Sequence, residues 1–518
     1  MTPLIQFKKP IPSSADLPRA AFYLLLLVAV SAIPFALAQP NATSHGLPAT
    51  IILVTNTNDS GPGSLRNALA IANDGDTIDA TGVSGTILLT SGELQINHNV
   101  TINGPSAGSL AVNGNATSRV FENFASNVTI SGFTITNGRV NDDNGGGILN
   151  HGGLTLSDSS IISNYAVATN PNSASGGGIA SSGGTLAVTN SVISSDGAAS
   201  GDGGGIIVSG GGTLTVTNSV ISGNIATQGG GISSDGATVT VNESSITSNG
   251  DCFAGGGIRS NNTQLTVMNS TISGNSSSGA CKVRGAGLGG GVSSMGSGSL
   301  TVINSTISGN SVAGPGGEGG GVYNSGGMLT VTNSTISGNE VDPMSADGGG
   351  VANYGNLTVS NSTFSDNSAP TGGSVWNGNG GAVQIGDTVL NAGASGGTIF
   401  INAGTVTSLG YNLASDNGGG VLTGPGDQIN TDPMLGPLQD NGGPTFTHAL
   451  LPGSPAINAG DPNFTPPPFF DQRGSGFDRV VNGRIDIGSF EVQAGSTPTP
   501  TPRPTPTPRP RPTPAPRP

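Results

Sequence analysis

The chain has 518 residues, of which 88 are glycine, while only 9% are charged and 4% are aromatic. A globular enzyme averages about a quarter charged residues and about 7% glycine, so this composition argues against an ordinary globular enzyme and favours a stacked repeat. The formal net charge of −14 opposes binding to nucleic acid or to an anionic membrane surface.

The N-terminus has the pattern of a secretory signal peptide. Lys8, Lys9 and Arg19 precede an apolar run that ends at the small-residue motif Ala36-Leu37-Ala38. We therefore expect residues 1–38 to be a cleaved signal and the mature protein to be secreted or held at the cell surface. No later stretch is long and apolar enough to cross a bilayer, so we expect no transmembrane segment after cleavage.

Residues 39–80 predict a strand followed by a capping helix. Thr50–Val54 is rich in β-branched residues, and residues 64–72 have helical apolar spacing with Ser64 as the N-cap. An open solenoid needs such a cap, because its terminal strand would otherwise pair with other chains.

Residues 81–370 contain the repeats. An eleven-residue cassette recurs eight times between Leu154 and Asn367, as in LTVTNSVISGN from Leu214. Its first, third and eighth positions are apolar, and the odd step from the third to the eighth predicts two short strands around a bend. A Gly-Gly-Gly-Ile/Val segment predicts a third strand. Three strands per turn, stacked about 4.8 Å apart, form a right-handed parallel β-helix, so the predicted fold class is all-β.

Two positions of the cassette hold asparagine. At the fifth position we predict a structural ladder of stacked side chains, with glycosylation as the alternative. That ladder comprises Asn190, Asn218, Asn269, Asn304, Asn333 and Asn361. At the last position we expect asparagine to adopt a left-handed backbone conformation in a turn. These residues are Asn224, Asn249, Asn275, Asn310, Asn339 and Asn367.

Cys252 and Cys281 are the only two cysteines, and each lies in the turn that follows one of two adjacent repeats. In an exported chain this spacing predicts a disulfide, which would contribute roughly 3–4 kcal/mol in the chain-entropy model. The alternative is a pair of unbonded thiols.

Two segments resemble known families. VTNTNDSGPGSLRNALAIANDGDTI (Val54–Ile78) resembles the CSLREA-domain proteins of exported bacterial chains, although Gly63 stands where that motif has its cysteine. GYNLASD (Gly410–Asp416), GDQINTDPMLGPLQDNGGPTFTHALLPGSPAINAG (Gly426–Gly460) and RIDIGSFE (Arg484–Glu491) resemble the choice-of-anchor Q domain. The resemblance implies an irregular, β-rich anchor domain over residues 371–495, an extracellular location and no reaction.

Residues 496–518 are rich in proline, threonine and arginine, and predict a disordered tail of polyproline II type. Two interpretations stay open for this tail: its arginines hold it against anionic envelope polymers, or it is an inert extension.

A parallel β-helix also suggests a polysaccharide lyase or hydrolase of the pectate-lyase-like type, although fold alone does not assign function. Within the cassettes the outward positions are mostly Ser and Thr. The basic residues there, Arg259, Lys282 and Arg284, are the candidate catalytic residues. Acidic residues before the glycine runs are interpreted as solvated turn residues rather than as a line of calcium ligands. They are Asp142, Asp143, Asp202 and Asp347.

The densest acidic set lies near the C-terminus and gives a calcium hypothesis, with capping of turns by Asp as the alternative. Its members are Asp416, Asp427, Asp432, Asp440, Asp471 and Asp486. No other cofactor is predicted. The histidines show no zinc or triad spacing.

The sequence thus predicts a secreted or surface-displayed β-helix scaffold, monomeric, with a role in adhesion or in the envelope or matrix. Its expected partners are extracellular polysaccharides or cell-envelope polymers, and nucleic acid is not among them. Enzymatic activity is left open, and the alternative function is that of a polysaccharide lyase or hydrolase.

Overall fold

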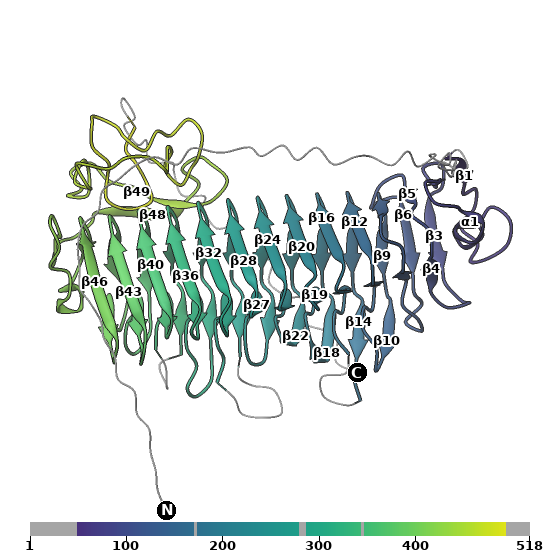
Figure 1. Ribbon diagram of the computed structural model, residues 1–518, viewed down its shortest axis with the longest axis horizontal. Coiled ribbons are helices and arrows are strands. Elements are labelled where there is room, and N and C mark those ends of the chain that lie inside the picture. Colours follow the sequence, from purple (N-terminus) through teal and green to yellow (C-terminus); the bar gives the residue numbers. More distant parts are fainter. Residues whose placement is uncertain (1–48, 170–173, 279–285, 343–346, 494–518) are drawn as a thin grey trace, which may run out of the picture. The chain divides into compact units, whose positions relative to one another are not determined.

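The strand segments of the repeats build four parallel sheets that run along one solenoid (Figure 1). The computed structural model describes residues 49–169, 174–278, 286–342 and 347–493. A turn of the chain contributes at most one strand to each sheet. Neighbouring strands within these four sheets are parallel, and they are in register apart from local shifts in three pairs. The predicted all-β parallel β-helix is confirmed.

Sheet A has 14 strands and contains the first half of each cassette. Its outward positions are mostly Thr and Ser, and its inward positions are Leu, Val and Ile. Its strands are β1 Ile51–Leu53, β2 Thr77–Asp79, β5 Thr101–Asn103, β8 Val128–Ser131, β12 Gly153–Ser157, β16 Thr185–Thr189, β20 Thr213–Thr217, β24 Thr238–Asn242, β28 Gln264–Met268, β32 Ser299–Ile303, β36 Met328–Thr332, β40 Asn356–Ser360, β43 Ala382–Gly386 and β46 Thr405–Gly410.

Sheet B has 13 strands and contains the second half of each cassette, after the bend. Its strands are β3 Gly85–Leu88, β6 Leu110–Asn113, β9 Thr134–Thr136, β13 Ser160–Ile162, β17 Val192–Ser194, β21 Val220–Ser222, β25 Ser245–Thr247, β29 Thr271–Ser273, β33 Thr306–Ser308, β37 Thr335–Ser337, β41 Thr363–Asn367, β44 Val389–Ala392 and β47 Leu413–Ala414.

Sheet C has 12 strands, most of which follow the glycine runs. They are β4 Leu94–Ile96, β7 Phe121–Asn123, β11 Ile148–Asn150, β15 Ile179–Ser182, β19 Ile206–Ser209, β23 Ile232–Asp235, β27 Ile258–Asn261, β31 Val292–Met295, β35 Val322–Asn324, β39 Val351–Asn353, β42 Val375–Asn377 and β45 Ile399–Ile401.

The sequence predicts three strands per turn, but the structure contains a fourth parallel sheet, sheet D, which has eight strands. Its strands are short and directly follow the last residue of the cassette, so they show too few alternations to be recognised in the sequence. They are β10 Arg139–Asn141, β14 Tyr165–Val167, β18 Gly197–Asp202, β22 Ile225–Gln228, β26 Gly250–Asp251, β30 Ser276–Ser277, β34 Ser311–Val312 and β38 Glu340–Val341.

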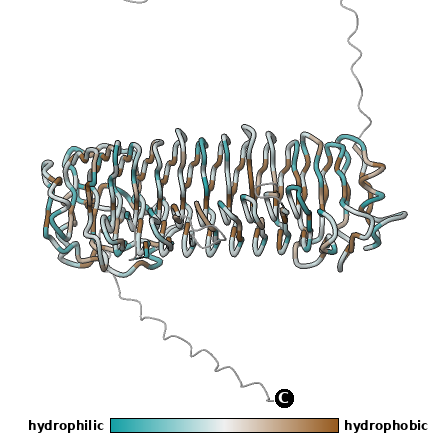
Figure 2. Tube along the Cα trace, turned by 90° about the horizontal axis from the view of Figure 1, so that it is seen from below, coloured by the Kyte–Doolittle hydropathy of each residue, from teal (hydrophilic) through white to brown (hydrophobic). Residues whose placement is uncertain are grey.

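One hydrophobic core fills the solenoid, and apolar residues recur in every turn (Figure 2). A typical turn contributes Leu214 and Val216 from sheet A, Ile221 from sheet B and Ile232 from sheet C, each with no exposed surface. Burial of one such side chain is worth about 1.5–3 kcal/mol, and each side chain stacks on its counterpart in the neighbouring turns.

The glycine runs allow the backbones of neighbouring turns to approach closely. Gly203 has a φ of 68°, which favours glycine, and a Cβ on the following Gly204 would lie 2.5 Å from the carbonyl oxygen of Gly230 in the next turn. Glycine is thus required in each run for two reasons: one residue has a positive φ, and another leaves no room for a Cβ beside the backbone of the next turn.

The prediction that the asparagine at the last cassette position adopts a left-handed backbone conformation is wrong. These asparagines do not adopt positive φ; the residue before them does, as in Gly223 and Gly274. Their side chains are fully buried and form a continuous set of hydrogen bonds that we call the inner ladder. Its members are Asn164, Asp196, Asn224, Asn249, Asn275, Asn310, Asn339 and Asn367.

In the inner ladder each asparagine accepts and donates in a fixed pattern. Asn249 Nδ2 donates to Asn275 Oδ1 at 3.0 Å and to the carbonyl oxygen of Ile221 at 2.9 Å, while the Asn249 backbone N–H also donates to Asn275 Oδ1. The buried corner after sheet B therefore has its polar groups satisfied.

The residue at the fifth cassette position is the one that adopts a left-handed backbone conformation. We call the stacked residues at this position the bend column. Its φ values lie between 45° and 53°, and asparagine tolerates them at little cost. Side-chain hydrogen bonds join the pairs Asn190–Asp158, Asn218–Asn190, Asn304–Asn269 and Asn333–Asn304. Glu243 interrupts the series, so this ladder is partial; Asn190 and Asn218 are exposed, whereas Asn333 and Asn361 are buried.

The predicted helical cap is confirmed as α1, Leu65–Ile71, with Ser64 as its N-cap. Ser64 Oγ accepts a hydrogen bond from the Asn67 backbone N–H at 3.1 Å, and Leu65, Ala68 and Leu69 are buried in the core. The strand β1 before it forms the outer edge of sheet A.

The solenoid extends beyond the predicted boundary at residue 370. Strands β42 to β47 continue sheets A, B and C as far as Ala414, and the short 3-10 helix η1, Gly418–Gly420, follows them. The segment that resembles an anchor domain therefore begins inside the solenoid, because its first strands have the same alternation as the repeats.

Residues 429–493, which we call the C-terminal lobe, are mostly irregular, with one antiparallel pair, β48 Leu435–Gln439 and β49 Thr447–Leu450. The lobe packs on the outer face of sheet B (Figure 1). Val389 and Leu413 of sheet B share a small hydrophobic cluster with Leu450, Ile487 and Phe490 of the lobe.

The predicted signal at residues 1–38 and the predicted tail at 496–518 lie outside the described residues. Among the residues that are described, no helix is long and apolar enough to span a membrane.

Candidate functional site

Charged side chains are unevenly distributed over the solenoid. Between residues 49 and 414, the described part of the chain has four arginines and no lysine. Three of the arginines, Arg66, Arg119 and Arg139, line one cleft, and the fourth, Arg259, projects from sheet C. The described basic groups of the solenoid thus lie at sheets C and D and at the helix before them.

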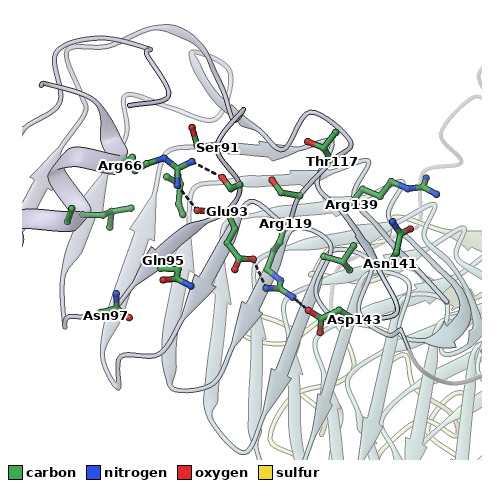
Figure 3. A pocket seen from close by; sticks show the side chains of 16 residues that line it. Arg66, Ser91, Glu93, Gln95, Asn97, Thr117, Arg119, Arg139, Asn141 and Asp143 are labelled. Carbon is green, nitrogen blue, oxygen red and sulfur yellow. Dashed lines mark hydrogen bonds and ion pairs between the residues drawn. The ribbon is translucent and has the colours of Figure 1, made fainter. Parts of the chain in front are cut away.

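The cleft lies at the N-terminal end of sheet C and has a volume of about 780 Å³ (Figure 3). We call it the N-terminal cleft. Its walls come from α1, from the turn before β4, from the residues before β7, and from β10 with the turn that follows it. Ligand pockets in proteins commonly have volumes of about 300–1,000 Å³.

Arg119 holds the floor of the cleft together. Its guanidinium is 3% exposed, and its Nη1 and Nη2 lie 2.6 Å from Glu93 Oε2 and Asp143 Oδ2 respectively (Figure 3). Its Nε donates to the carbonyl oxygens of Asn144 and Gly145. One buried cation therefore positions two carboxylates from different turns on the same wall.

Glu93 is the titratable group with the clearest shift in the cleft. Burial raises the pKa of Glu93 above that of an ordinary glutamate, Arg119 opposes the rise, and Glu122 adds to it. Glu122 also lies 3.2 Å from His151 Nε2, on the neighbouring strand of sheet C. These contacts connect acidic and basic groups of three successive turns.

Arg66 fixes the helix to the rim of the cleft. Its Nη2 lies 2.7 Å from Asp59 Oδ1, and its terminal nitrogens donate to the carbonyl oxygens of Gly92 and Glu93, each at 2.6 Å. These bonds orient α1 against β4, so the cap and the cleft form one rigid element.

Four polar side chains of the cleft are free to bind a ligand. Within the described chain no hydrogen bond or ion pair to a protein group occurs for the side chains of Gln95, Asn97, Arg139 and Asn141. Amide groups both donate and accept, and a guanidinium donates up to five hydrogen bonds. This arrangement suits a polyhydroxylated ligand.

The predicted catalytic residues are not brought together in the described structure. Arg259 on β27 donates from Nη1 to Ser233 Oγ at 3.3 Å and lies 3.8 Å from Asp202 Oδ2. It stands five strands of sheet C away from Glu122 and does not reach the N-terminal cleft. Lys282 and Arg284 lie outside the described residues.

The predicted disulfide also involves a residue that is not described. Cys252 is buried after β26, whereas Cys281 lies outside the described residues, so the Cys252–Cys281 bond stays a prediction.

The six aspartates of the calcium hypothesis are scattered. Across the described ranges no group of three or more His, Cys, Asp or Glu side chains could hold a metal ion. Each carboxylate instead accepts hydrogen bonds from nearby backbone or side-chain groups: Asp416 from Thr398, Asp427 from Asn412, Asp432 from Met434, Asp440 from Gly442, Asp471 from Arg473 and Asp486 from Asn458. The geometry agrees with the alternative of turn capping.

Two of the acidic residues that precede the glycine runs lie beside features described here. Asp143 lines the N-terminal cleft, and Asp347 lies beside an aromatic cluster. Tyr323 and Trp376 occupy the same register position of sheet C on either side of Ala352, and the ring of Tyr354 lies 5.8 Å from the ring of Tyr323 and 5.0 Å from that of Trp376. Tyr354 Oη donates to Glu318 Oε1 at 2.8 Å, and Trp376 is buried. The cluster is therefore mainly a packing element of sheet C.

Sequence reasoning missed the N-terminal cleft because it lies in the least regular turns. Glu93, Arg119 and Asp143 fall outside the eleven-residue cassette, and their proximity depends on the stacking of turns whose lengths differ. The available signal was the concentration of arginine at positions 66, 119 and 139 in a chain that has very few.

Comparison with known proteins supports the fold. A family model described as "Right handed beta helix region" matches residues 172–335, and no curated protein matches the chain. Three solved structures are similar: pectate lyase Pel9A (14% identity, TM-score 0.36, 85% of this chain and 96% of that one), Dettilon tailspike protein gp208 (15%, 0.38, 66% and 65%), and the catalytic unit of a thermostable GH87 α-1,3-glucanase from Streptomyces thermodiastaticus strain HF3-3 (16%, 0.34, 70% and 68%). Likeness at this level concerns the fold only.

Proposed function

We propose that this chain is an exported β-helix scaffold that binds a polysaccharide in the N-terminal cleft. The observation that carries the proposal is the set of free hydrogen-bonding side chains, Gln95, Asn97, Arg139 and Asn141, around a rigid floor built on Arg119. A rigid floor limits the conformational entropy that binding costs.

The chemistry of the cleft favours a neutral or weakly charged sugar chain. Arg66 and Arg119 are already paired with Asp59, Glu93 and Asp143, so Arg139 is the one described arginine of the cleft left for a ligand. The acidic body would repel a polyanion at longer range. Hydroxyl groups of a sugar, in contrast, pair with amides at any ionic strength.

The two ends of the sequence support a surface role in adhesion or in the envelope or matrix. The signal-like residues 1–38 favour export, and the resemblance of residues 371–495 to a choice-of-anchor domain favours display outside the cell. A tail of about 3 Å per residue would hold the solenoid away from the surface to which it is attached.

A binding assay tests the proposal directly. The purified full chain is titrated with a panel of neutral and acidic polysaccharides, and Arg139→Ala is expected to weaken binding about tenfold, which corresponds to about 1.4 kcal/mol. Arg259→Ala is the matched control, because Arg259 is on the same side of the solenoid but outside the cleft. Equal binding by the wild-type chain and by Arg139→Ala, or binding to none of the polysaccharides, contradicts the proposal.

Glycoside hydrolysis in the same cleft is the second candidate function, and Glu93 is the observation that favours it. A carboxyl group with a raised pKa beside the carboxylate of Asp143 resembles the acid and base pair that hydrolysis requires. Hydrolysis would release reducing ends, and Glu93→Gln would abolish that release while retaining binding. Both carboxylates are engaged by Arg119, which is why we favour binding over catalysis.

A further inference from the structure

A second cleft lies at the other end of the solenoid, between the C-terminal lobe and sheet B, and nothing so far assigns it a role. It has a volume of about 560 Å³. One wall is polar, with Ser337, Asp366 and Asn391 from sheet B, and the other includes Leu435 and Leu438 from the lobe, with His448 between the walls. We call it the lobe cleft.

Ser337 and His448 form a close pair in this cleft. Ser337 Oγ lies 2.9 Å from His448 Nε2, and His448 Nδ1 lies 2.7 Å from the carbonyl oxygen of Gly436. A carbonyl oxygen can only accept, so Nδ1 must carry the proton. In the neutral ring Nε2 then has the free electron pair and accepts the hydroxyl proton of Ser337.

The surroundings keep the histidine neutral. Burial lowers the pKa of His448 below its usual 6.5, and the hydrogen bond to Gly436 and the charge of Asp366 offset this only in part. Asp366 is the charged group that faces it from the solenoid side. At neutral pH the ring is therefore a free base rather than a cation.

Ser337 differs from the equivalent residues of other turns. Ser222, Ser273, Ser308 and Ser365 occupy the same outward position of sheet B. In the described structure only Ser337 bonds to a histidine, because β49 crosses sheet B at its turn. The repeat supplies the serine at this site, and the lobe supplies the base.

We propose that the Ser337–His448 pair is a nucleophile and general base that hydrolyse a carboxylic ester with a short acyl group. Ser337 Oγ attacks the ester carbonyl carbon while His448 Nε2 takes the hydroxyl proton. The C–O bond to the alcohol then breaks, and His448 returns the proton to the leaving alkoxide oxygen. Water attacks the acyl-serine in the same way, releasing the carboxylic acid and restoring Ser337.

The walls of the lobe cleft fit this reaction. Leu435, Pro437 and Leu438 offer an apolar surface to the acyl group. Gly436 orients the imidazole through its carbonyl, the role that the third member of a catalytic triad performs.

The full chain is treated with a fluorophosphonate probe, and peptides are examined by mass spectrometry. We expect covalent modification at Ser337 and hydrolysis of p-nitrophenyl acetate that falls at least a hundredfold in Ser337→Ala and in His448→Gln. Ser273→Ala is the matched control, since it removes the same hydroxyl two turns away and outside the cleft.

A purely structural contact between the lobe and the solenoid predicts different results. In that case the wild-type protein stays unmodified by the probe and hydrolyses the ester no faster than buffer alone, and this outcome overturns the proposal without any variant having to fold. The pH profile is a further readout: hydrolysis should begin to fall only at a pH below the usual imidazole pKa of 6.5, because burial lowers the pKa of His448. An inflection at or above pH 6.5 contradicts the assignment of His448 as the base.

Discussion

Asp196 takes the place of an asparagine in the inner ladder. Its Oδ1 accepts from the Asn164 backbone and from Asn164 Nδ2, as an asparagine would, but its Oδ2 has no hydrogen-bond partner although it is fully buried. In the other turns that position is an amide that donates to an isoleucine carbonyl, as Asn224 does to Ile193. Ile161, which pairs with Ile193, is the equivalent acceptor for Asp196.

Asp196 should therefore make stability depend on pH. Burial raises the pKa of Asp196 well above 3.8, because the charged carboxylate loses its contact with water, while the hydrogen bonds from Asn164 oppose the rise. Its contribution is complete below about pH 4 and is lost as pH rises through the folded pKa. Asp196→Asn should add about 1–3 kcal/mol at pH 8 and little at pH 4, measured by denaturant unfolding at both values.

Asn249→Asp is the converse test, since it introduces a carboxyl into the same environment. It should be less stable at pH 8 than at pH 4. If Asp196→Asn changes stability equally at both pH values, the carboxyl is not protonated in the folded chain.

At the scale of the strand and turn, the bend between sheets A and B depends on one backbone conformation per turn. Asn269 has a φ of 50° there and also donates to Asn242 Oδ1 at 3.3 Å. Asn269→Val should cost about 1–2 kcal/mol because a side chain branched at Cβ disfavours a positive φ, whereas Asn269→Gly should change stability by only a few tenths of a kcal/mol. Thermal unfolding of the two variants measures the difference.

Thr266→Val serves as the control for that prediction. Thr266 lies on β28 with its side chain outward and no hydrogen bond from its hydroxyl to the described protein, so valine suits the strand there. A loss in Thr266→Val as large as that in Asn269→Val would mean that replacing an outward polar side chain by valine, not the backbone conformation, causes the effect.

The repeating elements were predictable, while their exceptions were not. Apolar residues such as Leu214, Val216 and Ile221 fix the strands and their inward faces through spacing alone. The two asparagine positions could not be told apart, because asparagine suits both a buried ladder and a left-handed turn. The structure settles the matter: the bend comes first, at Asn218, and the ladder second, at Asn224.

The candidate sites were harder to predict than the strands, because their residues come from different turns or different domains. Arg119 is 26 residues from Glu93 and 24 from Asp143, and it meets both only when irregular turns stack. Ser337 and His448 are 111 residues apart. No spacing rule applies to such pairs, since the lobe that brings His448 to sheet B is itself irregular.

At the scale of the whole molecule, the C-terminal lobe joins several turns of the solenoid to one another. Gln472 has no exposed surface; its Oε1 accepts from Thr335 Oγ1 at 2.6 Å, and its Nε2 donates to Thr306 Oγ1 and Thr445 Oγ1 at 2.8 and 2.9 Å. Thr306 and Thr335 belong to neighbouring strands of sheet B. One amide thus connects two turns to the lobe.

Gln472→Ala should loosen the lobe while the solenoid stays folded. The substitution removes the hydrogen bonds of the amide to Thr306, Thr335 and Thr445 and leaves a cavity between the lobe and sheet B, which should cost about 2–3 kcal/mol. Limited proteolysis should then cut the lobe several times faster, while fragments of the repeats persist. Gln264→Ala, an exposed position of sheet A, should behave like the wild-type chain, and equal cleavage of Gln472→Ala and wild type would contradict this role.

The parallel register of the sheets determines how the chain would carry a mechanical load. Hydrogen bonds between successive turns lie along the direction in which the turns stack, so tension between the two ends of the solenoid opens them one turn at a time rather than shearing many at once. Every released turn would lengthen the chain by roughly 30 residues of extended backbone. The turns held by the lobe, from β33 to β44, must yield together, so extension under force should start in the unclamped turns nearer α1.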